Sequence, residues 1–152
     1  MAQPPAWHEA YPTPRNQSPK VVVTRQELLQ WLQEGQKPGV DFLLVDLRRT
    51  DHEGGSIKGS INLPAQSLYP SLPTLLNLCQ SAGVRTVIWY CGSSKGRGTR
   101  ACGWFQDMLD DRQVDGMTSA ILLDGISGWA RAGEEYTRLM EEYDAEKWSS
   151  AK

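Results

Sequence analysis

Cysteine and histidine are scarce in this chain of 152 residues, which contains three cysteines and two histidines. The cysteines, Cys79, Cys91 and Cys102, form no Cys-x-x-Cys pair, and their odd number leaves at least one thiol unpaired. With so few soft ligands we expect no metal site and no bound cofactor. This cysteine usage fits a reducing compartment, so the cytosol is the expected location, with the nucleus as an alternative.

Long hydrophobic runs are also missing. No stretch approaches the ~20 apolar residues that cross a bilayer, and the first residues lack the charged-then-apolar layout of a secretory signal. The net charge of −2 argues against a nucleic-acid-binding surface. We therefore expect neither a membrane nor a nucleic acid as a partner. The length fits one globular domain.

Proline is concentrated at the start, where residues 1–19 contain five prolines. Such a segment forms neither a regular helix nor a central strand. Because it also contains Trp7 and Tyr11, we predict an extended arm lying on the domain, with a free tail as the alternative. The rest of the chain, residues 20–152, is predicted to be one domain that includes a C-terminal helix.

Apolar periodicity in residues 20–152 alternates between strand and helix patterns. Strands are expected at residues 20–23, 41–46, 85–90 and 119–123, with a further extended segment at 57–63. Helices are expected at residues 24–35, 72–82 and 97–109, as a short helix after a turn at 125–129, and along a C-terminal face of Tyr136, Leu139, Met140 and Tyr143. This alternation predicts an α/β fold with a central parallel five-stranded sheet and helices on both faces.

The most informative segment is residues 91–97, CGSSKGR, which joins the strand at 85–90 to the next helix. Sites in parallel sheets lie beyond the carboxyl ends of the strands. Free loop amides and a helix N-terminus favour an anion there, and they favour a thiolate over a thiol. We therefore predict that Cys91 is a nucleophile beside a cradle for a tetrahedral oxyanion.

The cradle requires donors without steric obstruction. Glycines admit the ligand to the backbone, successive N–H groups bind its oxygens, and a guanidinium donates to two oxygens at once. The residues predicted to bind the oxyanion are Gly92, Ser93, Ser94, Lys95, Gly96 and Arg97, with Cys91 and Arg97 as the catalytic pair. The serine hydroxyls are candidate additional donors.

Two other interpretations of this segment are weaker. A strand cysteine is often a buried, inert core residue, but the polar sequence after Cys91 offers a core nothing apolar. A nucleotide-binding loop requires the order Gly-x-x-x-x-Gly-Lys-[Ser/Thr], which is absent.

Three segments in order resemble the rhodanese superfamily: residues 44–48 (LVDLR), 53–64 (EGGSIKGSINLP) and 123–129 (LDGISGW). The resemblance covers residues 20 to about 133 and implies a rhodanese-like domain. In that superfamily sulfurtransferases typically have a six-residue loop, whereas cell-cycle dual-specificity phosphatases and eukaryotic arsenate reductases have Cys-x5-Arg. Cys91 to Arg97 spans seven residues, so the resemblance implies a cradle sized for phosphate or arsenate.

The loop sequence is most similar to small fungal arsenate reductases of this group, so arsenate reduction is the first predicted activity. The resemblance implies glutathione as co-substrate and a glutaredoxin-type partner. A phosphatase acting through phosphocysteine is the second interpretation, and thiosulfate sulfur transfer is the third. A non-catalytic module that captures phosphorylated partners is the alternative outside enzymes. A homodimer is compatible with the sequence.

The chain departs from the cell-cycle phosphatases at three positions. Tyr90 stands where those enzymes usually have His, Leu47 where they have a protective Cys, and Gly96 where they have Glu beside the arginine. These differences weaken the cell-cycle reading more than the reductase reading.

Other residues carry a functional and a structural interpretation. Asp51, Glu53 and Asp124 are candidate general acids, although a solvated surface carboxylate is the simpler reading of each. Cys102 is a candidate resolving thiol, but for it and for Cys79 we favour core packing. We expect Asp46 to cap loop amides behind the sheet, and Trp129 to be a packing residue.

Overall fold

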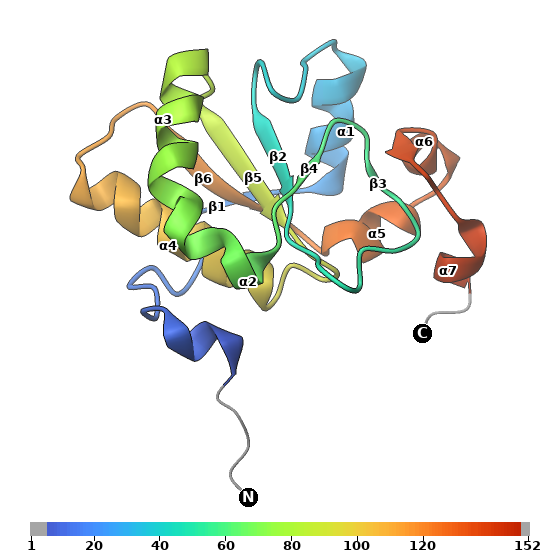
Figure 1. Cartoon of the computed structure of the whole chain (residues 1–152). Helices are drawn as coiled ribbons and strands as arrows, with labels where there is room; N and C mark the ends of the chain where they lie inside the picture. The colour runs from blue at the N-terminus through green and yellow to red at the C-terminus, as the bar shows by residue number, and fades with distance from the viewer. Residues whose placement is uncertain (1–5, 150–152) are drawn as a thin grey trace, which may run out of the picture.

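The computed structural model describes residues 6–149, and its centre is a parallel sheet (Figure 1). The strands lie in the order β1-β6-β5-β2-β4, and each neighbouring pair is parallel. Their bounds are Val21–Val23 for β1, Leu43–Asp46 for β2, Ile61–Asn62 for β4, Thr86–Tyr90 for β5 and Thr118–Leu122 for β6. The predicted α/β fold with a five-stranded parallel sheet is confirmed.

Helices cover both faces of this sheet (Figure 1). One face is covered by α2 (Ala65–Leu68), η2 (Tyr69–Ser71), α3 (Leu72–Ala82) and α4 (Arg97–Asp111). The other is covered by α1 (Arg25–Gln33), α5 (Gly125–Ala130), α6 (Glu134–Thr137) and α7 (Ala145–Ser149). Because side chains alternate along a strand, Trp89 packs on the α4 side and Tyr90 on the α1 side.

The start of α1 and the end of α3 lie where the sequence predicted them, and local contacts determine both. Thr24 and Glu27 form a reciprocal capping box before α1, with each side chain accepting the other residue's backbone N–H at 3.1 and 3.0 Å. α3 ends at Gly83, which has a φ of +75°. These ends depend only on neighbouring residues, which explains why sequence alone located them.

The predicted C-terminal helix is wrong. Residues 134–149 form α6, then strand β7 (Met140–Glu141), then α7, and β7 pairs antiparallel with β3 (Ser56–Ile57). Glu142 has a φ of +57°, which interrupts any continuous helix. The predicted extended segment 57–63 is likewise split, because the chain turns at Gly59 (φ +89°) between β3 and β4.

The described part of the N-terminal arm lies against α4 and contains a 3-10 turn, η1 (Trp7–Ala10), that the proline content did not predict (Figure 1). The ring of Trp104 contacts the rings of Trp7 and Tyr11, and its Nε1 donates to the carbonyl of Pro12 at 2.8 Å. The Asn16 amide group donates to Asp107 at 2.6 Å. The aromatic residues of the arm therefore fasten it to the helix that begins at Arg97.

Gly103 on α4 sets how closely the arm approaches. An added Cβ would overlap the carbonyl oxygen of Asn16 and the ring of Pro14. We therefore expect Gly103→Ala to lift the arm and to lower the free energy of unfolding by about 1–3 kcal/mol, although alanine is the better helix former. Faster tryptic cleavage after Arg15 would show the release. Gln106→Ala is the control, because Gln106 donates to Asp110 of its own helix; equal cleavage of both variants would refute the prediction.

Candidate active site

The candidate site lies where β5 ends and α4 begins, with Cys91 as the first residue after β5. Cys91 is 3% exposed and packs on the α4 side of the sheet. The Ile126 and Ser127 amides at the start of α5 donate to the carbonyls of Cys91 and Gly92, each at 3.0 Å. Because a trans peptide has its C=O and N–H on opposite sides, the N–H groups of Gly92 and Ser93 point away from α5.

The serines of the loop stabilise its curvature. Ser94 has a φ of +67° and is buried, and its Oγ accepts the Cys91 N–H at 3.4 Å. The Ser93 hydroxyl accepts the Lys95 N–H at 3.3 Å. A left-handed residue within such a turn draws successive N–H groups together on one side. Both hydroxyls accept a backbone N–H of the loop in these bonds, and each keeps an O–H that can donate to a ligand.

Arg97 is the first residue of α4, and Gly96 before it has no side chain to cap the helix amides. The two terminal nitrogens of Arg97 donate to the two carboxylate oxygens of Asp51 at 2.8 and 2.6 Å. The Arg97 side chain is 24% exposed and that of Asp51 is 48% exposed. The guanidinium is therefore held at the edge of the loop, with part of its donor set committed to a protein carboxylate.

Asp51 and Arg97 each stabilise the charged form of the other. The hydrogen bond from Arg97 holds the pKa of Asp51 well below its usual value of 3.8, although partial burial opposes this effect. The pKa of Arg97 is raised, first by Asp51 and also by the charge of the nearby Cys91. Asp51 is thus an ionised partner of Arg97 and not a proton donor, which was one of the two roles predicted for it.

The pair also contributes to stability in a pH-dependent way. Because the pKa of Asp51 is lower in the folded state, the contribution is complete above pH 3.8 and is lost as the pH falls below it. Exposure of both side chains limits it to less than about 1 kcal/mol.

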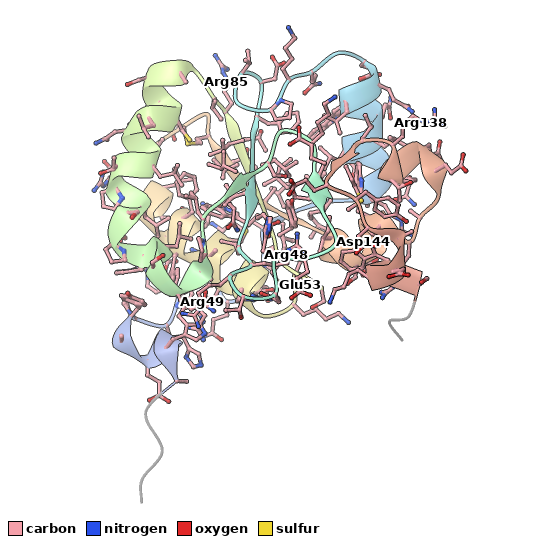
Figure 2. The ribbon with its side chains drawn as sticks, turned by 45° about the vertical axis from the view of Figure 1, so that its right-hand side comes forward. Arg48, Arg49, Glu53, Arg85, Arg138 and Asp144 are labelled. Atoms are coloured by element: carbon pink, nitrogen blue, oxygen red, sulfur yellow. The ribbon has the colours of Figure 1, made fainter. Side chains whose placement is uncertain are left out.

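A buried arginine organises the loop that carries Asp51. Arg48 is 1% exposed, and its Nη2 donates to Asp46 at 2.8 Å. Its guanidinium also donates to the carbonyls of Glu53 and Gly55 at 2.9 and 2.8 Å. Figure 2 shows Arg48 and Glu53 together at one end of the sheet, with Arg85 at the opposite end. Arg48 therefore fixes both flanks of the turn from which Asp51 reaches Arg97.

Comparison with known proteins gives the family. The rhodanese-like domain model matches residues 24–132. The chain belongs to the rhodanese family. No curated protein matches the chain.

Three solved structures resemble this one. Two are of Saccharomyces cerevisiae Ygr203w, described as a yeast protein tyrosine phosphatase of the rhodanese family and as a homologue of single-domain rhodanese and the Cdc25 phosphatase catalytic domain. Both are 26% identical with a TM-score of 0.70, and they cover 84% and 86% of this chain and 95% and 93% of Ygr203w. The third is an As-Sb reductase from Leishmania major, at 19% identity and a TM-score of 0.60. The match covers 69% of this chain and 72% of the reductase, and it supports the fold alone.

The late rhodanese signature supports the loop from behind. Gly125 has a φ of +58°, and an added Cβ would overlap the carbonyl oxygens of Cys91 and Gly92. Trp129 of the same signature is fully buried, and its Nε1 donates to the carbonyl of Tyr136 at 2.8 Å, which confirms a packing role.

We expect Gly125→Ala to lower the free energy of unfolding by about 2 kcal/mol or more, because backbone strain and overlap add together. Gly83→Ala is the matched control, since Gly83 has a similar φ of +75° with no other atom within 4 Å of the added carbon. Urea unfolding of both variants measures the difference. A loss at Gly125 no larger than that at Gly83 would show that the overlap is relieved without cost.

Asp46, Cys79 and Cys102 have structural roles in this rhodanese domain. Asp46 accepts the backbone N–H of Arg48 at 3.0 Å, as predicted. Burial raises the pKa of the Cys79 and Cys102 thiols, and the Ser119 hydroxyl donates to Cys102. Both cysteines are therefore core residues.

Tyr90, which replaces the phosphatases' histidine, faces the other side of the sheet from Cys91. Its hydroxyl lies 2.8 Å from that of Ser60 and accepts the Ile57 N–H at 3.3 Å. Burial raises its pKa, so the phenol stays protonated. Tyr90 ties β5 to the β3–β4 segment.

Residues 6–149 contain no group of three or more His, Cys, Asp or Glu side chains placed to hold a metal ion. No helix in that range is long and apolar enough to cross a membrane.

Proposed function

We propose that this chain is a Cys91-dependent phosphatase acting on phosphate monoesters. The supporting observation is that Cys91, directly after β5, and Arg97, the first residue of α4, stand at the two ends of one loop whose Cys91 and Gly92 carbonyls are turned toward α5. A nucleophile and a planar cationic donor thus share one loop. The resemblance to Ygr203w over most of both chains supports the same chemistry.

In the proposed reaction the Cys91 thiolate attacks phosphorus, and the ester P–O bond breaks. The leaving oxygen takes both bonding electrons and a proton, which gives an alcohol or phenol and a phosphocysteine. Water then attacks phosphorus, the S–P bond breaks, and phosphate and thiolate are released. Loop N–H groups and Arg97 stabilise the charge on the equatorial oxygens in both steps.

The source of the leaving-group proton limits the substrate. Asp51 is held ionised by Arg97, Asp124 lies 3.3 Å from Arg25, and Glu53 lies 3.7 Å from Lys147. A carboxylate that is held ionised has no proton to donate to a leaving group, which excludes Asp51 from that role. The proposed enzyme therefore favours esters whose leaving group needs little protonation, such as aryl phosphates.

Arsenate reduction is the second candidate function, and the lack of a committed acid favours it. Arsenate loses its oxygen as water, so the step needs less assistance than ester cleavage. A Cys91–arsenic(V) adduct attacked by glutathione would release arsenite, with arsenic gaining two electrons and the two sulfurs forming a mixed disulfide. Because Cys79 and Cys102 are buried, glutathione and a glutaredoxin-type protein would have to supply the reducing thiols.

Parallel assays of the wild-type protein separate these functions. We expect release of phosphate from p-nitrophenyl phosphate without any added thiol. Arsenite formation that requires glutathione and glutaredoxin, without ester hydrolysis, would replace the first function by the second. Thiocyanate formation from thiosulfate alone would overturn both, and tight phosphate binding without turnover would indicate a binding module.

A further inference from the structure

An apolar hollow of about 270 Å³ lies directly beside the Cys91 loop. Ser93, Ser94 and Lys95 form its loop side. Pro19, Val22, Ile121 and Leu123 form its apolar wall, and Thr99 and Asp124 complete the lining. The hollow therefore shares residues with the loop that is proposed to bind phosphate.

The register of the sheet explains why these apolar side chains gather. Val22 of β1 is paired with Ile121 of β6 in a parallel ladder. Leu123 follows Ile121 by two residues, and its N–H donates to the Val23 carbonyl at 2.9 Å, which continues the ladder. Side chains two apart lie on the same face of a sheet, so all three project toward the α4 side.

Two of these residues are unusually exposed for their size. Val22 is 45% and Leu123 is 47% exposed, beside the polar loop. Val21 is also exposed, at 39%, but it projects from the opposite face of the same strand. An apolar surface next to an anion-binding loop is what an ester with a charged phosphate and an apolar organic group would contact.

The arm holds the hollow in shape. Pro19 lies at the end of a segment that is fastened to α4 through Asn16 and Asp107, and Lys20 lies 3.7 Å from Asp110. A site whose walls are already in place needs little ordering when a ligand binds. The arm thus contributes to the site as well as to the stability of α4.

We propose that this hollow binds the apolar organic group of a phosphate monoester whose phosphate occupies the Cys91 loop. The inference rests on the proposed phosphatase function and narrows its substrates to esters with an apolar group. Arsenate and inorganic phosphate have no such group and leave Val22 and Leu123 uncovered.

The test compares phenyl and 2-naphthyl phosphate, whose leaving groups differ chiefly in apolar size, with inorganic phosphate as competitive inhibitor. We expect Leu123→Ser to raise KM for 2-naphthyl phosphate about tenfold, to raise it less for phenyl phosphate, and to leave the inhibition constant of phosphate unchanged. Val22→Thr should act in the same direction. Val21→Thr is the matched control and should change none of these values.

The outcomes separate this inference from the function on which it rests. If hydrolysis depends on Cys91 but Leu123→Ser leaves KM for 2-naphthyl phosphate unchanged, the proposed role of the hollow is refuted and the proposed phosphatase function stands. That result is expected for a surface that contacts a protein partner. Parallel changes in KM and in phosphate inhibition would also overturn it, because they report a damaged loop. Absence of ester hydrolysis by the wild type would overturn both.

Discussion

Replacing Cys91 by serine is expected to reduce turnover of any phosphate ester by roughly four orders of magnitude or more. Serine has nearly the same shape, but its hydroxyl is far less ionised than a thiol near neutral pH and is a poor nucleophile without an adjacent base. The backbone contacts of the loop, from Ile126 and Ser127 to the two carbonyls, do not involve the sulfur. The variant should therefore fold normally and still bind inorganic phosphate, which calorimetry can measure.

The other two cysteines provide the controls. Cys79 and Cys102 are buried in the core on the α3 and α4 side, so Cys79→Ala and Cys102→Ala should lower the melting temperature and retain activity per folded molecule. Loss of activity in Cys102→Ala at a temperature where it is folded would make that thiol a reaction partner. If Cys91→Ser turned over substrate at the wild-type rate, the Cys91 sulfur would not be the nucleophile.

Much of this fold follows from signals that the sequence carries locally. Alternation of strand and helix patterns identified the central strands β2, β5 and β6, and the carboxyl end of β5 placed Cys91 at the edge where α/β sheets form sites. The capping box at Thr24 and the glycine at residue 83 end their helices through contacts with immediate neighbours. Such features need no knowledge of the tertiary structure.

Local sequence patterns did not predict the structure of the C-terminal segment. Tyr136, Leu139 and Met140 have helical spacing, but Met140 lies opposite Ile57 in the short β3–β7 pair. That pairing joins residues more than 80 positions apart, whereas Tyr136 lies in the short helix α6 and packs on Trp129 of α5. Tertiary contacts outweighed local preference here, as they often do in short apolar segments.

The partner of Arg97 was equally hidden from the sequence. Asp51 lies 46 positions earlier, in a turn without a distinctive motif, and was interpreted only as a candidate acid or a surface charge. What brings it to Arg97 is the buried Arg48, whose donors hold the carbonyls of Glu53 and Gly55. The LVDLR signature thus affects the site indirectly, because Arg48 positions the turn and the turn places the Asp51 carboxylate beside Arg97.

Arg97→Lys is the second substitution expected to have a large effect, a loss of about 10²–10³-fold in kcat/KM for aryl phosphates. A guanidinium has five N–H donors in one plane, and two of its nitrogens donate to Asp51. The remaining donors are available to an oxyanion without breaking that pair. A lysine ammonium has the same charge but no planar fork, so it cannot serve the carboxylate and two phosphate oxygens together.

Asp51→Asn separates the charge of this carboxylate from its positioning effect. Asparagine retains an acceptor for Arg97 but removes a negative charge that repels a phosphate dianion, so inorganic phosphate should inhibit this variant at lower concentration than wild type. If Asp51 also orients the guanidinium, kcat should fall at the same time, by less than in Arg97→Lys. The double variant Arg97→Lys, Asp51→Asn should then be no worse than Arg97→Lys alone, because the two residues act as a unit. Full activity in Arg97→Lys, or additive losses in the double variant, would show that the planar fork held by Asp51 is not what binds the oxyanion.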